Sequence, residues 1–282
     1  MNKKEANNRL PRNFHKTFKP ERQYINAMLR YAASGQSGDY LTIAAATGIP
    51  TGKSSGKVPA ILDYCRGMGL IKLAGTKLSA VKLPELTHFG RIVLLEDPFM
   101  KCGISQWIAH FNMCSPLSGA DIWYHTFFVG LSALGQAFTR EKLEAYLQVV
   151  YGISKIVKIG PIVGMYEDEA AFKNCGALSE EGGIITRKPA PISDEYGNGY
   201  GAWLLQLISE HFPNQMQVSL AELNTVAGWR TIPYWNITEL IKALALIERK
   251  GFIDVDRHME PWIVSVKKNP EKTWRAIYND MI

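Results

Sequence analysis

The 282-residue chain has no apolar run of about 18 residues, and its first residues are polar and basic. We therefore expect neither a membrane span nor a signal peptide, and we predict a cytoplasmic protein without membrane contact. Cysteine is scarce, and no two cysteines are spaced as C-x-x-C; the four are Cys65, Cys102, Cys114 and Cys175. Such scattered cysteines predict reduced, buried thiols. We expect neither a metal nor a cofactor.

Sequence patterns of common catalytic sites are also missing or incomplete. A phosphate loop needs G-x-x-x-x-G-K-[ST], because four residues must curl around the phosphates before the lysine. Here only three residues separate Gly48 from Gly52. His110 and Cys114 stand four apart, but no third metal ligand lies near them in the sequence. We predict that the protein is not an enzyme by itself.

Positive charge is unevenly distributed along the chain. The net charge is +6, and residues 1–101 hold 16 Lys and Arg against 7 Asp and Glu. Residues 102–200 hold 7 against 10, and residues 201–282 hold 9 against 9. A basic N-terminal part is the electrostatic footprint that a polyanion-binding protein needs. The alternative is a solvated basic surface that serves solubility.

The N-terminal third has the order of elements of a winged helix-turn-helix. Helical spacing of apolar residues predicts helices over 20–33, 40–47 and 55–68. Two short strands that turn at Gly75 follow. Helix, short helix, turn, helix and hairpin is the winged helix-turn-helix layout.

The start of the third predicted helix is the candidate DNA-reading tip, because that end of a recognition helix meets base edges and phosphates. The polar residues at this tip are Lys53, Ser54, Ser55 and Lys57. A basic arm precedes the module, and we expect it to contact phosphates through Arg9, Arg12, Lys16 and Lys19.

The last third repeats this order of elements. Ser219 is predicted to cap a short helix, a second helix is predicted from Pro233 to Arg249, and two alternating segments flank a wing. The candidate DNA contacts of this module are Arg230, Thr231, Tyr234 and Asn236 near the helix start and Arg257 in the wing. Because this part carries no net charge, docking of a protein partner is an equal alternative.

Between the two modules we predict a helical, aromatic-rich region from about Glu85 to Tyr151, followed by a connector. The connector contains an acidic helix candidate at Tyr166–Asn174 and a short strand at Gly183–Arg187. The predicted fold class is mainly α (α+β), with winged helix-turn-helix modules at both ends of a helical middle region. The predicted domains are 1–100, 101–198 and 199–282.

Three stretches resemble the bacterial domain of unknown function four thousand and seven family. They are NFHKTFKPERQYINAML, GIPTGKSSGKVPAILDYCRGMGLI, and LTHFGRIVLLEDPF with the tryptophan-rich helices after it. The resemblance covers roughly residues 13–150, although Phe14 and His15 are adjacent here, unlike in the family's opening motif. It implies a helix-turn-helix protein found near DNA phosphorothioation and other defence genes. It also implies a sulfurtransferase-like partner enzyme.

Three functional hypotheses follow from these observations. The leading one is a DNA-binding accessory subunit of a prokaryotic DNA-modification system of the phosphorothioation type, or of an antiphage defence system. Its partners would be double-stranded DNA and a sulfurtransferase-like or other DNA-modification enzyme. The alternatives are a protein–protein adaptor built on tandem winged helices and a transcriptional regulator. The sequence does not determine the oligomeric state.

Overall fold

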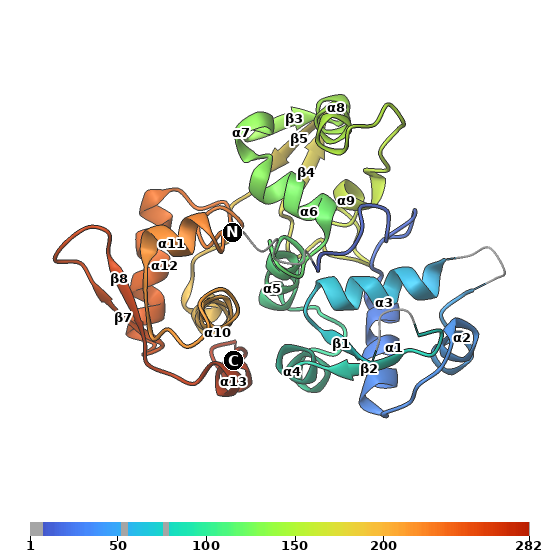
Figure 1. Cartoon of the computed structure of the whole chain (residues 1–282), viewed down its shortest axis with the longest axis horizontal. Coiled ribbons are helices and arrows are strands. Elements are labelled where there is room, and N and C mark those ends of the chain that lie inside the picture. Colours follow the sequence, from blue (N-terminus) through green and yellow to red (C-terminus); the bar gives the residue numbers. More distant parts are fainter. Residues whose placement is uncertain (1–7, 52–55, 76–78, 282) are drawn as a thin grey trace, which may run out of the picture. The chain divides into compact units, whose positions relative to one another are not determined.

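The computed structural model describes residues 8–51, 56–75 and 79–281, and the chain divides into two compact units, 1–188 and 189–282 (Figure 1). The first unit contains the predicted N-terminal region and residues 101–188 of the predicted middle region, whose last part, 189–198, belongs to the second unit. Helices alternate with small antiparallel sheets in each unit, so the fold is mixed α+β. Among the described residues, no helix is long and apolar enough to cross a bilayer.

The first elements of unit 1 follow the predicted order. They are α1 (Arg22–Ala33), α2 (Tyr40–Thr47), α3 (Lys57–Gly67), β1 (Ile71–Ala74) and β2 (Leu83–Leu86). Asp39 caps α2 by accepting a hydrogen bond from the Thr42 amide, and Gly48 ends it in the left-handed conformation at φ 70°. An isolated antiparallel bridge between Gly38 and Lys82 adds a third chain segment beside the hairpin.

The middle of unit 1 is less helical than predicted. It contains α4 (His88–Glu96), α5 (Gly103–Met113), α6 (Asp121–Trp123), the π-helix η1 (Tyr124–Val129), α7 (Leu131–Leu134), β3 (Ala137–Thr139), α8 (Arg140–Tyr151), α9 (Gly160–Gly164), β4 (Leu178–Glu181) and β5 (Ile184–Arg187). The predicted strand at Gly183–Arg187 is confirmed as β5. The predicted acidic helix at Tyr166–Asn174 is wrong, because these residues form turns. The prediction of a helical region from about Glu85 to Tyr151 is wrong at β3, which is a strand.

Unit 2 consists of α10 (Asp194–His211), β6 (Gln217–Ser219), α11 (Leu220–Thr225), α12 (Ile237–Arg249), β7 (Ile253–Asp256), β8 (Ile263–Val266), α13 (Pro270–Thr273) and the 3-10 turn η2 (Trp274–Ala276). Ser219 caps α11 as predicted, and Glu222 completes a capping box with it. The predicted helix start at Pro233 is wrong, because α12 begins at Ile237. Gly201 lets Phe252 pack against α10, since an added Cβ would lie 2.6 Å from that ring.

One order of elements occurs in both units. In unit 2, a helix, strand β6, two helices and a hairpin give a sheet of order β6-β8-β7. The middle of unit 1 also places a short strand before a helix and a hairpin after it, and its sheet has the corresponding order β3-β5-β4. The instance in the middle of unit 1 was not predicted, because strand β3 has only three residues.

Candidate nucleic-acid interface

The segment that was expected to be a free arm is packed against unit 1 from residue 9 onward. Arg9 Nε lies 3.0 Å from Asp121 Oδ1, and the guanidinium lies 3.9 Å from the centre of the Tyr124 ring. Leu10 is buried and forms a parallel bridge with Ala120. These contacts tie the segment to α6, so Arg9 is held within the fold rather than presented on a flexible tail.

Of the other three predicted arm cations, Lys16 is exposed, and Arg12 and Lys19 are half-buried. Arg12 lies over the ring of Tyr151, with 5.0 Å between the guanidinium carbon and the ring centre. Lys16 is exposed, and its side chain crosses Gly56, where an added Cβ would lie 2.3 Å from the lysine Cδ. Lys19 pairs with Asp168 on the connector. Arg12 and Lys16 therefore remain the two arm cations that can reach an anion.

The predicted DNA-reading tip of α3 is directed inward where the structure describes it. Lys53, Ser54 and Ser55 lie outside the described residues. Lys57 Nζ is 2.7 Å from Glu21 Oε1, and it also lies 4.2 Å from the centre of the Tyr24 ring. Its side chain is 14% exposed. Its charge is compensated inside the chain, which does not fit the predicted phosphate contact.

The rest of α3 is buried as well. Seven of its residues are buried, namely Val58, Ala60, Ile61, Leu62, Tyr64, Cys65 and Gly67. The Tyr64 ring packs edge-on against Phe14, 4.8 Å between centres, and its hydroxyl donates to the Phe18 carbonyl. The arm segment thus covers the face that a recognition helix would present. In this conformation α3 is a largely buried helix of unit 1, and its docking in a groove stays a prediction.

His15, the histidine of the opening family-like motif, is fully buried beside this helix. Both of its ring nitrogens are buried, and its ring meets Trp123 edge-on at 6.0 Å. Burial lowers the pKa of His15 to about 4; a backbone hydrogen bond at Lys16 opposes this shift and the charge of Lys158 adds to it. The imidazole is therefore neutral near pH 7, and it serves packing rather than charge.

A buried polar network occupies the centre of unit 1. The Tyr166 hydroxyl accepts a hydrogen bond from Trp123 Nε1 at 3.0 Å and lies 2.7 Å from His110 Nδ1. Burial lowers the pKa of His110 to about 3, so the imidazole that meets the Tyr166 hydroxyl is neutral near pH 7. Cys114 Sγ is 3.8 Å from the same ring. Across the residues that can be described, no three His, Cys, Asp or Glu side chains gather to hold a metal.

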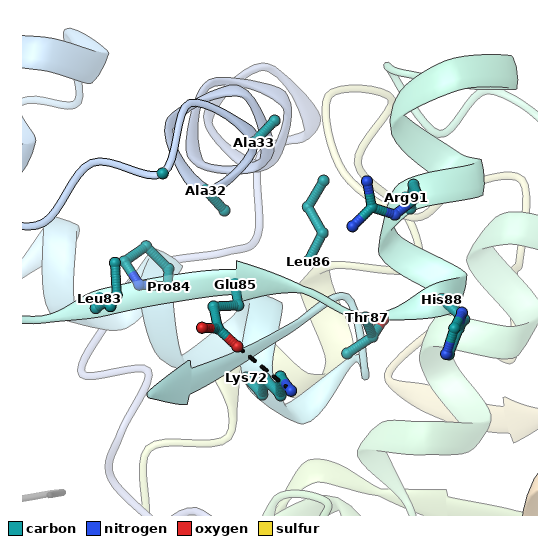
Figure 2. A pocket seen from close by; sticks show the side chains of 11 residues that line it. Ala32, Ala33, Lys72, Leu83, Pro84, Glu85, Leu86, Thr87, His88 and Arg91 are labelled. Atoms are coloured by element: carbon teal, nitrogen blue, oxygen red, sulfur yellow. Dashed lines mark ion pairs between the residues drawn. The ribbon is translucent and has the colours of Figure 1, made fainter. Parts of the chain in front are cut away.

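A surface pocket of about 700 Å³ lies between the end of α1, strand β2 and the start of α4 (Figure 2). Arg91 extends from α4 toward β2, and Lys72 pairs with Glu85 across the hairpin at 3.3 Å. None of the predicted interface residues that the structure describes lines it. Its walls mix polar and apolar residues, and this lining does not point to a particular class of ligand.

The start of α12 gathers the predicted residues of unit 2. Arg230 is exposed, and Thr231 and Tyr234 are half-buried in the turn that precedes the helix. Tyr234 has φ 61°, a left-handed conformation that keeps residues 233–235 out of the helix. Asn236 caps the helix, accepting from the Glu239 amide at 2.9 Å, while Glu239 accepts from the Asn236 amide at 2.8 Å.

Helix α12 has one buried face and one exposed face. Leu240, Ala243, Leu244, Leu246 and Ile247 are buried within unit 2. The exposed residues are Ile237, Thr238, Ile241, Lys242, Ala245 and Arg249. Their spacing of three and four residues places them along one side of the helix. Unlike α3, this helix presents a continuous outer surface.

The hairpin β7–β8 carries the predicted wing next to α12. Arg257 pairs with Glu248 at 2.8 Å and lies over the Trp262 ring at 5.5 Å. His258 hydrogen-bonds Asp256 at 2.8 Å and is exposed. The structure therefore brings Arg257 to α12 through Glu248. Sequence reasoning did not single out Thr238 and Lys242, although their helical spacing on a polar face could have found them.

Comparison with known proteins gives a likeness of fold. No protein-family model and no curated protein matches the chain. Two solved structures of SspB resemble it, one with bound magnesium ion at a TM-score of 0.71 and 17% identity, the other at 0.72 and 18%. Each comparison covers 95% of this chain and 87% of the solved chain. At this identity the likeness shows a shared fold across both units.

Proposed function

We propose that this chain is a DNA-binding component of a prokaryotic DNA-modification or defence system of the phosphorothioation type. The observation that carries the proposal is the outward face of α12, which lies beside a turn with Arg230 and a hairpin with Arg257. The fold shared with SspB and the sequence resemblance to a family found near phosphorothioation genes support the same assignment.

In this proposal, unit 2 is a winged helix-turn-helix. Helices α11 and α12 are its helix-turn-helix, and the β7–β8 hairpin is its wing, with β6 as the third strand of the sheet. Such a module places the second helix in the major groove and leaves the wing near the backbone. Arg230, Lys242 and Arg257 are then the cations nearest the phosphates.

The distribution of charge between the two units agrees with this proposal. Unit 1 holds 23 Lys and Arg against 15 Asp and Glu, whereas unit 2 holds 9 against 11. Electrostatic attraction to DNA would therefore come chiefly from unit 1, where Arg12 and Lys16 are accessible. Specific contacts would come from α12. In this proposal α12 rather than α3 reads the groove, and the predicted DNA ligand is kept.

The test is a salt series of DNA binding by the full chain, followed by fluorescence anisotropy of a labelled duplex. The double variant Arg230→Ala/Lys242→Ala should bind about tenfold more weakly, and its salt slope should fall by about two, one for each lost contact. The matched control Lys272→Ala/Arg275→Ala removes two exposed cations at α13 and η2 instead. It should bind like the unchanged protein.

Equal affinities for both double variants would overturn the α12 interface. Failure of the full chain to bind duplex at about 50 mM salt, a concentration at which phosphate contacts are strong, would overturn DNA binding altogether. If a DNA-modification enzyme nevertheless co-purified with the chain, a protein–protein adaptor function would replace the DNA-binding function. Phosphorothioated and unmodified duplexes of one sequence belong in the same series, because they show whether the modification is recognised.

Catalysis needs its own measurement. One of the similar SspB structures holds a magnesium ion, so supercoiled plasmid should be incubated with the full chain in magnesium buffer. Retention of the supercoiled form fits a binding component, which is the role proposed here. Conversion to open circles would assign the chain a hydrolytic role instead.

A further inference from the structure

The outer face of α12 carries isoleucine where a solvated helix would carry polar residues. Ile237 is 58% exposed and Ile241 is 39% exposed. With the exposed Ala245 they stand four residues apart, in one row along the helix. The core of unit 2 is filled from the opposite face, so these side chains are not needed for folding.

Polar and cationic groups border this apolar row. Thr238 and Lys242 form the next row of the same face, and Arg230 lies exposed in the turn before the helix. Of the carboxylates near the face, Glu239 accepts from the Asn236 amide and keeps its charge, and Glu248 is paired with Arg257. The surface is therefore an apolar row flanked by positive charge, which is complementary to an anionic partner that presents apolar groups between its charges.

Duplex DNA has this arrangement in its major groove. The C5-methyl of thymine is the apolar group on the groove floor, and phosphates line both edges of the groove. Isoleucine side chains projecting from a helix in the groove would contact methyls, while Arg230 and Lys242 would lie toward the phosphates.

Resting on the proposed function, we propose that Ile237 and Ile241 read thymine methyl groups, so that the preferred DNA site contains thymine at the positions facing these side chains. This assigns apolar contacts to the two isoleucines. It predicts a sequence preference in which A·T pairs are chosen through the methyl rather than through a hydrogen bond.

Replacing thymine by uracil is the direct test, because it removes the methyl and keeps the hydrogen-bonding pattern of the base. The full chain is first used to enrich its preferred duplex from a random library. Thymines of that duplex are then replaced singly by uracil, and affinities are measured by anisotropy. Loss of one methyl contact should weaken binding about fourfold, the value of one buried methylene-sized group.

Alanine variants test whether Ile237 and Ile241 carry the preference for thymine. Ile237→Ala and Ile241→Ala should weaken binding to the thymine duplex and should bind thymine and uracil duplexes equally at the position each side chain faces. Both sites are exposed and alanine favours helix, so the fold should persist. Ile156→Ala is the matched control, because Ile156 is 82% exposed and lies in unit 1. It should keep the preference for thymine.

The two proposals fail in different ways. Tight duplex binding with no difference between thymine and uracil at any position would overturn the methyl reading and leave DNA binding intact. A preference for thymine that survives in Ile237→Ala/Ile241→Ala would overturn the assignment to these residues. Absence of duplex binding would overturn both proposals. Loss of a protein partner in the double variant, with DNA binding unchanged, would make this face a protein-docking surface and would overturn the methyl reading.

Discussion

Lys57 Nζ and Glu21 Oε1 form an ion pair of 2.7 Å that joins the start of α3 to the residue before α1. The lysine also faces the ring of Tyr24 at 4.2 Å. Both partners are mostly covered, with side-chain exposures of 14% and 28%. The pair thus connects two helices of the core of unit 1, and its first consequence concerns stability rather than DNA.

Lys57→Ala should lower the free energy of unfolding by about 1–2 kcal/mol, more than an exposed pair contributes, because a covered cation–carboxylate and a cation–π contact are both lost. The measurement is urea unfolding of the full chain followed by circular dichroism. Lys72→Ala is the control, since Lys72 is 68% exposed in its pair with Glu85, and it should change stability little. Weaker DNA binding with unchanged stability in Lys57→Ala would restore this lysine to the interface.

The burial of α3 could not be predicted from its sequence. Its apolar spacing identifies a helix correctly, but the residues that cover it are distant in the chain. Phe14 packs on Tyr64, and Met113 and Leu10 crowd Gly67, where an added Cβ would lie 2.7 Å and 2.9 Å from their side chains. An isolated helix-turn-helix pattern cannot show that an arm and a later helix close over its outer face.

The start of α12 illustrates a different limit. Pro233 is compatible with a first helical position, and nothing local in the sequence rejects it. The chain instead turns at Tyr234 in the left-handed region, and the Asn236–Glu239 capping box starts the helix four residues later, at Ile237. Arg230, Thr231, Tyr234 and Asn236 lie near this end, whereas Arg257 pairs with Glu248 near the other end of α12. Their pattern was therefore informative about the site, although it misplaced the boundary.

Asn236 provides a test that separates capping from base recognition. Asn236→Ala should lower the free energy of unfolding by about 1 kcal/mol, because the Glu239 amide loses its acceptor. Asn236→Ser keeps a capping oxygen and should cost a few tenths of that value. Thermal unfolding checks both. If DNA affinity falls in both variants while only alanine destabilises, the Asn236 amide contacts DNA; if affinity follows stability, Asn236 serves only as a cap.

A substitution at Tyr166 should lower the free energy of unfolding strongly. Tyr166→Phe removes the hydroxyl that joins Trp123 Nε1 and His110 Nδ1, and both ring nitrogens would remain buried without this partner. The expected loss is about 2–3 kcal/mol, the cost of leaving buried polar groups unsatisfied. Urea unfolding monitored by tryptophan fluorescence measures it. Tyr40→Phe, at a 38% exposed tyrosine, is the matched control. Equal stabilities of the two variants would contradict the network.

Burial of His15 makes the stability of unit 1 depend on pH. The folded-state pKa of about 4 lies below the ordinary value of 6.5, so the unfolded chain binds the extra proton between these values. This contribution is fully present above pH 6.5, and it is lost progressively as the pH falls toward 4. One such group gives a slope of about 1.4 kcal/mol per pH unit within that window.

His15→Phe should remove this slope, because the ring keeps its contacts with Phe14 and Trp123 but cannot take up a proton. Urea unfolding at several values between pH 4 and 7 compares the variant with the unchanged chain, and the difference between the two curves isolates His15 from the carboxylates. His15→Leu guards against a misfit of the larger ring, since it should flatten the curve equally. Parallel curves for all three proteins would show that His15 is solvated or partnered in solution.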